Sequence, residues 1–155
     1  MTYHIEIYAD VDVQANVNEI LITAASTALL QQSYPPVSMT LLLVDDSRIQ
    51  QLNRDFRGID RPTDVLSFPA GELSPNSLEE LPYVGDIAIS MPYARKQAEA
   101  GEHSLLAELQ LLVVHGTLHL IGYDHITNED RARMWSLQQE ILTQLGLYYI
   151  TPTED

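Results

Sequence analysis

The chain has 155 residues, of which 45% are hydrophobic, and it contains no cysteine. This length is typical of one domain with a sizeable core, and the apolar content excludes a disordered chain. The lack of cysteine excludes disulfides, thiolate zinc sites and cysteine nucleophiles, so any metal must bind to imidazole or carboxylate groups. We therefore expect residues 1–155 to form a single domain.

The net charge of −14 argues against a general affinity for nucleic acids, which usually depends on a basic surface. The few basic residues are nevertheless grouped in three places along the chain. They are Arg48, Arg54, Arg57 and Arg61, then Arg95 and Lys96, and finally Arg131 and Arg133. A local basic patch on an acidic body and scattered, solvated side chains both fit this distribution.

The N-terminal part of the chain carries no targeting pattern. No basic residue precedes Arg48, whereas a secretory signal needs a basic stretch ahead of an apolar run. The apolar runs are also far shorter than the roughly 20 residues that span a bilayer. We therefore expect a cytoplasmic protein without a membrane partner.

In chain order, apolar periodicity predicts four strands and two helices before Ser90. The strands are expected at 3–9, 39–45, 65–69 and 84–90, and the helices at 17–29 and from about residue 46 to Asn53. The segment 70–82 is rich in proline, serine and glutamate and is expected to be a loop.

Three more helices are predicted in the rest of the chain, because serine and threonine favour helix starts and glycine favours helix ends. They are expected to begin after Ser90, at about residue 104 and after Thr127, and the last two are expected to end before Gly122 and near Gly146. On the last helix, Met134, Trp135 and Gln138 fall at helical spacing and are expected to face the core. A polar tail from about residue 150 is expected to be loose.

The predicted order of elements is β-α-β-α-β-β-α-α-α. One mixed sheet with helices packed against it is the simplest arrangement for this order. The first crossover, from strand 3–9 through a helix to strand 39–45, should be parallel and right-handed.

Three of the five histidines lie in one short segment, HGTLHLIGYDH. His115 and His119 share a face of the long predicted helix, about 6 Å apart along its axis. Gly122 ends that helix and lets the chain reverse, so that His125 can supply a third nitrogen. Three protein ligands leave the fourth position of tetrahedral Zn²⁺ open, as in catalytic zinc sites. The alternative is that these histidines cap or pack in a core.

Gly116 separates this segment from that of a protease. The spacing H-x-x-x-H-x-x-G-x-x-H is that of the metzincin proteases, in which a glutamate general base follows the first histidine. Gly116 cannot accept a proton, so a protease built on this helix would lack its base. A glycine within a helix costs about 1 kcal/mol, which indicates either close approach of backbone or substrate, or helix packing that needs a small residue. His4 and His103 lack partner spacing and are expected to be ordinary surface or capping residues.

Two further blocks accompany the histidine segment, NRDFRGIDRPTDVLSFP at 53–69 and GDI at 85–87. The first resembles the pattern N-x-x-[FY]-R-x-x-D-x-x-T-D-V-L-S-F, and the histidine segment matches H-G-x-L-H-L-x-G-Y-D-H, with Thr117 and Ile121 in its variable positions. Both patterns are those of the YbeY family of bacterial rRNA-maturation endoribonucleases, which the chain resembles over nearly its whole length.

The resemblance implies an α+β fold with a mixed four-stranded sheet and a zinc ion held by His115, His119 and His125. It implies cleavage of single-stranded RNA, maturation of the 3′ end of 16S rRNA and late ribosome quality control. The expected partners are therefore an rRNA precursor and ribosomal particles, and DNA is not expected.

Arg57 is the expected catalytic and substrate-binding group, because a guanidinium beside zinc can clamp a phosphate and offset charge that develops on its oxygens. Arg61 and Arg54 are expected to bind the RNA backbone on either side. The alternative for Arg57 is a surface ion pair with Asp60 or Asp55.

Three aspartates are further candidates. Asp86 belongs to the GDI block, and Asp124 immediately precedes a predicted ligand, so that either can orient a ligand or accept a proton in catalysis. Asp64 can cap a turn, hold Arg57 or orient a histidine.

Two other functions fit the same residues. A metalloprotease-like hydrolase shares the histidine spacing, although Gly116 counts against it. A non-catalytic ribosome-associated protein would use zinc only structurally, and a fourth protein ligand would then close the site. An open site favours the enzyme.

Overall fold

The computed structural model describes residues 2–73 and 81–150, which form one four-stranded mixed sheet with five helices. The strands are β1 (His4–Ala9), β2 (Ser38–Val44), β3 (Val65–Pro69) and β4 (Tyr83–Ser90). The helices are α1 (Val17–Gln31), α2 (Asp46–Arg57), α3 (Met91–Ala100), α4 (Leu105–Leu120) and α5 (Asn128–Gln144). The predicted α+β class and the predicted order of elements are confirmed.

The sheet has the strand order β1-β2-β4-β3. β1 is parallel to β2 and β2 is parallel to β4, whereas the edge strand β3 runs antiparallel to β4. The predicted parallel crossover between the first two strands is therefore confirmed. In the register of β3 with β4, Phe68 lies opposite Asp86 and Ser67 lies opposite Ile87.

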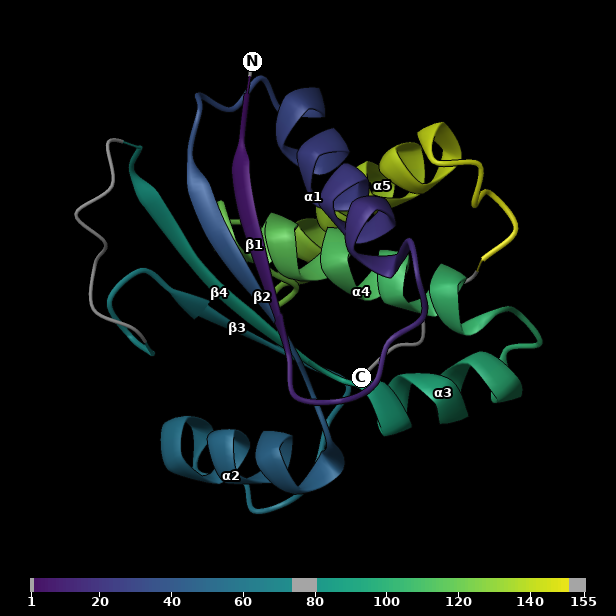
Figure 1. Ribbon diagram of the computed structural model, residues 1–155. Helices are drawn as coiled ribbons and strands as arrows, with labels where there is room; N and C mark the ends of the chain where they lie inside the picture. The colour runs from purple at the N-terminus through teal and green to yellow at the C-terminus, as the bar shows by residue number, and fades with distance from the viewer. Residues whose placement is uncertain (1, 74–80, 151–155) are drawn as a thin grey trace.

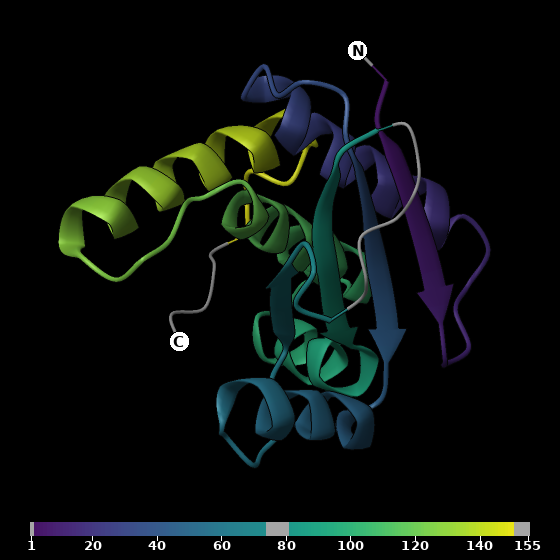
Figure 2. The ribbon, with the colours of Figure 1, turned by 90° about the vertical axis from the view of Figure 1, so that its left-hand side faces the viewer.

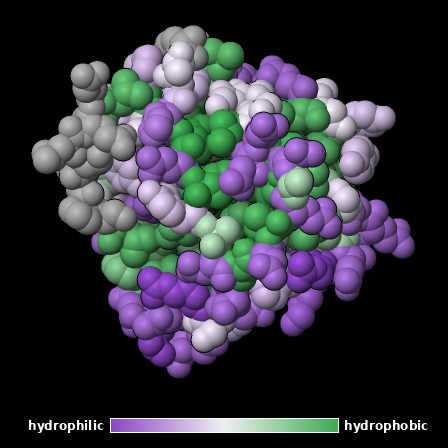
Figure 3. Space-filling model, in the orientation of Figure 1, coloured by the Kyte–Doolittle hydropathy of each residue, from purple (hydrophilic) through white to green (hydrophobic). Residues whose placement is uncertain are grey.

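Helices cover the two faces of the sheet unequally (Figure 1). α1, α4 and α5 lie on one face and form the main core with the strand residues Leu41 and Ile87. α2 covers only one end of the other face, where Ile49 packs with Phe68 and Ala88 in a smaller cluster. Figure 2 shows α2 at this end of the strands, with α4 and α5 to one side. Hydrophilic side chains cover the outside of α2, which lies at the bottom of Figure 3.

The predicted helix starts are confirmed by their capping bonds. The Ser90 hydroxyl accepts a hydrogen bond from the Tyr93 N–H (3.2 Å), and the Thr127 hydroxyl accepts one from the Asp130 N–H (3.0 Å). Each cap satisfies a backbone donor that has no partner within its own helix.

The predicted end of the second helix near Asn53 is wrong, because α2 continues to Arg57. Gly58 follows with φ of 74°, and its N–H donates to the Arg54 carbonyl. Glycine adopts this left-handed conformation without steric cost and so ends the helix here. The extra turn places Arg57 beside β3, since its guanidinium donates to the Ser67 carbonyl (2.8 Å).

Helix α4 lies directly on the sheet at Gly116. A Cβ atom at this position would lie 2.9 Å from two side-chain atoms of Ile87. The Ser67 hydroxyl also donates to the Gly116 carbonyl (3.3 Å). Of the two alternatives for this glycine, the packing alternative is therefore confirmed, because a larger side chain would push α4 away from β4.

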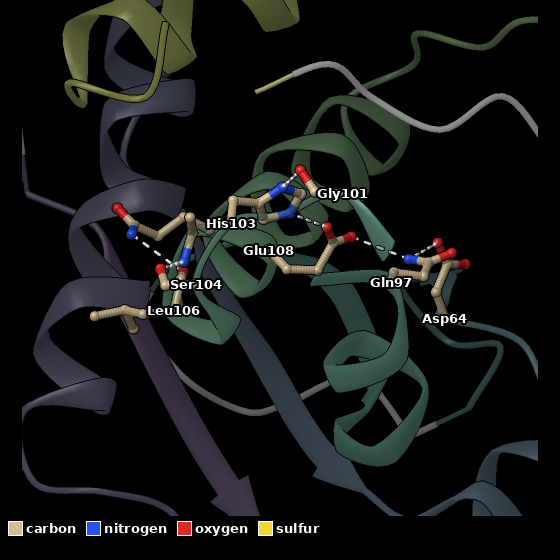
Figure 4. A network of polar contacts seen from close by, with 9 residues as sticks. Asp64, Gln97, Gly101, His103, Ser104, Leu106 and Glu108 are labelled. Carbon is tan, nitrogen blue, oxygen red and sulfur yellow. Dashed lines mark hydrogen bonds and ion pairs between the residues drawn. The ribbon is translucent and has the colours of Figure 1, made fainter. Parts of the chain in front are cut away.

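A buried polar network connects α3, α4 and the start of β3 (Figure 4). Gln97 donates from its Nε2 atom to Asp64 Oδ2 (3.2 Å) and to Glu108 Oε2 (3.0 Å). His103 Nε2 lies 2.6 Å from Glu108 Oε1, and the His103 side chain is only 7% exposed. The expectation that His103 lies on the surface is wrong, because the turn after α3 folds its ring onto α4. The alternative of a capping role fits its Nδ1 atom, which lies 3.3 Å from the carbonyl of Gly101, the C-cap of α3. Burial raises the pKa of Glu108.

The expected loose tail does not include Ile150, which is buried and donates from its N–H to the Leu147 carbonyl (3.2 Å). Residues 151–155 lie outside the described part of the chain, as does 74–80 within the predicted loop. None of the helices in the described ranges is both long enough and apolar enough to cross a membrane.

Candidate metal centre and substrate cleft

Helix α4 and the turn after it bring three imidazoles together. His115 and His119 lie on α4, and Gly122, with φ of 110°, reverses the chain so that His125 returns toward them. The ring centroids lie 4.8 Å apart for His115 and His119, and 5.1 Å apart for His119 and His125. The candidate ligand nitrogens all lie within 4.8 Å of one another. The predicted convergence of the three rings is therefore present.

Burial favours the neutral form of two of these imidazoles, His115 and His119. Burial lowers the pKa of His115. Burial, followed by the neighbouring His115 and His125 rings, lowers the pKa of His119 to about 4. A neutral imidazole has a free nitrogen lone pair, which is the form that binds a metal ion.

Helix α5 forms one side of this cluster. Its Gln138 side chain is fully buried, with Oε1 3.0 Å from His115 Nδ1. Met134 is also buried, as predicted. Trp135 is half-buried, and its ring lies edge-on to His115 at 5.8 Å and to His125 at 5.6 Å. Helical spacing predicted an inward face for α5 but did not indicate that this face meets the histidines.

The three residues suit a divalent ion of the first transition row that prefers imidazole ligands. Their rings converge on one region and come from a helix and an adjoining turn. Within the described residues, the cluster contains three candidate ligands. A tetrahedral ion held by three imidazoles has one position left for water or substrate, which is the arrangement of catalytic sites.

A cleft of about 410 Å³ opens beside the histidines. Its walls come from the three rings, from β3 and from two charged side chains, Arg57 and Glu72. The structure therefore brings the predicted guanidinium and the predicted metal ligands to one solvent-accessible space.

The expected alternative for Arg57, an ion pair with Asp60 or Asp55, is wrong. The guanidinium instead pairs with the Glu72 carboxylate through both of its terminal nitrogens. It also lies 4.9 Å from the centroid of the Phe68 ring, a cation–π contact. These contacts, together with the bond to β3, hold the guanidinium at the edge of the cleft.

The other two predicted RNA-binding arginines lie outside the cleft. Arg54 pairs with Asp55 at 3.2 Å and with Asp60 at 3.9 Å, and all three side chains are exposed. Arg61 is exposed in the loop after α2, where its carbonyl accepts a hydrogen bond from the Asn53 side chain (2.9 Å). Both arginines therefore flank the C-terminal end of α2, where Arg57 is the last residue.

Asp86 is not brought to the histidines. It lies opposite Phe68 in the sheet, on the face that α2 partly covers, whereas its neighbour Ile87 faces α4. The Tyr83 hydroxyl donates to Asp86 at 2.5 Å. Burial, followed by this hydrogen bond, raises the pKa of Tyr83.

Asp124 and Asp64 occupy different positions relative to the cluster. Asp124 accepts a hydrogen bond from the Ile126 N–H (3.2 Å), and its charge acts on His119 in the direction that raises the pKa of the ring. It lines a separate cavity of about 280 Å³. Asp64 is buried and accepts hydrogen bonds from the Val65 N–H (2.8 Å) and from the Gln97 side chain (3.2 Å), so it links the start of β3 to α3.

The α+β domain with a mixed four-stranded sheet, a trio of converging imidazoles and an arginine in an open cleft defines a metal-dependent hydrolase. The family model described as Endoribonuclease YbeY matches residues 3–146. The chain belongs to the YbeY family.

Similar proteins carry the same name. The chain is 40% identical over 141 residues to Endoribonuclease YbeY of Desulforamulus reducens, covering 89% of this chain and 92% of that one. It is 42% identical over 146 residues to the Brevibacillus brevis protein, covering 87% and 91%. The solution structure of a Thermotoga maritima protein has the same fold, with a TM-score of 0.57, 23% identity and 99% coverage of both chains.

Proposed function

We propose that this protein is a zinc-dependent endoribonuclease that cleaves single-stranded RNA. The observation that carries the proposal is that three converging imidazoles and an arginine line one open cleft. Zinc suits such a ligand set, and when bound it supplies Lewis acidity that activates water and polarises a phosphoryl oxygen.

The guanidinium of Arg57 binds the phosphate of the RNA backbone. In the structure it already binds an oxyanion in the cleft, the Glu72 carboxylate, through two nitrogens. Carboxylate and phosphate oxygens suit the same paired donors of a guanidinium. The scissile phosphate therefore takes the place of Glu72 on Arg57, beside the histidines.

The RNA enters the cleft as a single strand. A volume of about 410 Å³ lies near the lower end of the range for small-ligand pockets, roughly 300–1,000 Å³, so it suits one nucleotide unit rather than a paired helix. Arg54 and Arg61 are exposed at the same end of α2 and contact the phosphates on either side. When RNA binds, its phosphates replace Asp55 and Asp60, the exposed partners of Arg54.

Of the two candidate aspartates, Asp124 is the better placed for a role in the reaction. It immediately precedes a ligand, and its charge acts on His119. Asp86 lies on the other face of the sheet, and we propose a structural role for it through Tyr83.

The cellular substrate that we propose is the precursor of 16S rRNA, cut near its 3′ end in the cytoplasm, where ribosomes are assembled, with a further role in late ribosome quality control. Membership of the YbeY family supports this substrate. Ribosomal particles are then the partners that present the single-stranded segment.

The test uses purified protein with and without a chelator, on 16S rRNA precursor, on the same sequence as a duplex and on casein. Cleavage of the single strand alone, lost with chelator and restored by zinc, is the expected result. Undiminished cleavage in chelator overturns the metal requirement. Hydrolysis of casein, or particle binding without RNA cleavage, supports the protease or the non-catalytic alternative.

A further inference from the structure

A glutamine side chain is fully buried next to a predicted metal ligand. Gln138 lies on α5 among Met134, Ile141 and Leu142, all of them buried. An amide in such surroundings is unfavourable unless its polar atoms are hydrogen-bonded. Its Oε1 is bonded to His115 Nδ1 at 3.0 Å, whereas its Nε2 has no partner among the described residues. The hydrogen bond to His115 is therefore the interaction that compensates for the burial of this amide.

The chemistry of the two groups sets the direction of this bond. An amide oxygen only accepts, so Nδ1 of His115 must carry the proton. The proton-free nitrogen is then Nε2, whose lone pair is available to a metal ion. With the amide reversed, its NH₂ group would face Nδ1 and favour the tautomer that has a proton on Nε2, which cannot bind metal.

An amide orients the ring without adding charge. Histidine ligands are commonly oriented by a carboxylate, a backbone carbonyl or water. A carboxylate would offset one unit of the charge of a divalent ion, whereas Gln138 leaves that charge available to an anionic phosphodiester. A neutral partner therefore suits a site whose substrate is itself negative.

The same helix face provides a second contact. Trp135 lies one turn before Gln138 and its ring touches the edges of His115 and His125. The described cluster is thus enclosed on one side by α5, which lies beside α4 in Figures 1 and 2. Trp135 is the single tryptophan of the chain, so its fluorescence reports directly on this cluster.

We propose that Gln138 is a positioning residue, which holds His115 as the Nδ1–H tautomer with Nε2 directed to the metal. The proposal rests on the proposed function only in taking the three histidines to be the ligands. The tautomer itself is a property of the metal-free protein and can be measured in it.

The first measurement is the nitrogen-15 spectrum of the metal-free protein, in which long-range couplings identify the proton-bearing nitrogen of each ring. We expect His115 to carry its proton on Nδ1. A proton on Nε2 in the wild-type protein overturns the proposal without any variant. This result is independent of RNA cleavage, so it separates a failure of this inference from a failure of the proposed function.

The second measurement is zinc affinity, by competition with a coloured chelator and by Trp135 fluorescence. Gln138→Met keeps the length of the side chain but removes the amide, and we expect a 10- to 100-fold weaker affinity. Gln138→Glu keeps an acceptor and should bind zinc within a fewfold of the wild type. Gln139→Met, on the exposed side of the same helix, is the matched control and should change nothing.

Unchanged zinc affinity in a folded Gln138→Met protein, as judged by circular dichroism, contradicts the proposal. So does equal weakening in Gln138→Glu and Gln138→Met, because a purely structural role would not be rescued by the acceptor. If Gln138→Met does not fold, the wild-type tautomer and the Gln138→Glu affinity still decide the outcome.

Discussion

Helix α4 has a different histidine environment near each of its ends. Before its first turn, His103 is paired with the buried carboxylate of Glu108 at 2.6 Å (Figure 4). Near its last turn, His115 and His119 face a third imidazole, and His115 is also bonded to the Gln138 amide. Both environments are largely buried, so burial does not distinguish them.

The two environments differ in whether a ring nitrogen remains available to bind a metal ion. In the network, the ring nitrogens of His103 are both engaged, with Glu108 and with the Gly101 carbonyl. In the cluster, the hydrogen bond of His115 is made at Nδ1, which leaves Nε2 for a ligand. A histidine with a carboxylate partner stabilises the fold, whereas imidazole rings that converge on one point suit a metal ion.

The largest expected effect is that of removing a ring from the cluster. His119→Ala should abolish tight zinc binding and lower RNA cleavage by at least about 1,000-fold, because metal catalysis contributes several kcal/mol. His103→Ala is the matched control. It should keep zinc binding and cleavage but lose about 1–3 kcal/mol of unfolding free energy, since the buried Oε1 atom of Glu108 loses its partner and only the bond to Gln97 remains.

Zinc affinity, cleavage rate and urea unfolding of both variants provide the check. Full activity in a metal-free His119→Ala protein would contradict the metal site, and lost zinc binding in folded His103→Ala would contradict the separation of the two regions.

A second effect concerns the guanidinium in the cleft. Arg57→Ala should lower cleavage by about 100- to 1,000-fold, because it removes preorganised charge from the phosphate, as loss of one oxyanion donor does. Zinc affinity should not change. Arg54→Ala, at the same end of α2 but outside the cleft, should weaken RNA binding only slightly. Equal losses of activity in the two variants would show that Arg57 has no special position.

A smaller effect is expected from removing the charge of the carboxylate that pairs with Arg57. Glu72→Gln removes a partly exposed ion pair, worth roughly 0.2–1 kcal/mol, that the RNA phosphate must displace. We expect single-stranded RNA to bind up to about fivefold more tightly, in a titration of zinc-loaded protein with a labelled strand. Weaker binding would indicate instead that Glu72 holds Arg57 in its productive position.

The smallest effect is a change in the pH dependence of stability. Burial raises the pKa of Glu108 above its ordinary value of 4.5, so the folded protein holds this proton more tightly than the unfolded chain. The stabilisation is present below pH 4.5 and is lost as the pH rises through the raised pKa. The wild type should therefore lose unfolding free energy relative to Glu108→Gln over this range. Parallel pH profiles of the two proteins in urea unfolding would contradict the raised pKa.

The elements of the fold were predictable where the signals are local. Capping hydroxyls such as Ser90 and Thr127 lie within a few residues of the donors they satisfy, and apolar runs such as 39–45 indicate a buried strand on their own. The end of α2 was predicted too early. Its last turn is exposed and has three charged residues, and Phe56, which continues the helical spacing of Ile49 and Leu52 and packs on Phe68, was the signal that the helix extends to Gly58.

The candidate site was predictable to the extent that it is built from neighbouring residues. His115, His119 and His125 lie on one helix and its turn, so spacing alone indicates that they converge. Gln138 and Glu72 reach the site only because α5 packs on α4 and the chain returns after β3. Neither residue type distinguishes such a position from an exposed one. The burial of His103 was missed for the same reason, since its partner lies on the next helix.

The third ligand lies outside the helix that carries the other two. His125 belongs to the connection between α4 and α5, so an ion bound by all three rings joins this connection to the end of α4. Occupancy then stabilises the folded chain by mass action, and most directly the segment from Gly122 to Thr127. Slower amide exchange and slower proteolysis of that segment would accompany loading, and a cell short of zinc would degrade the unloaded copies first.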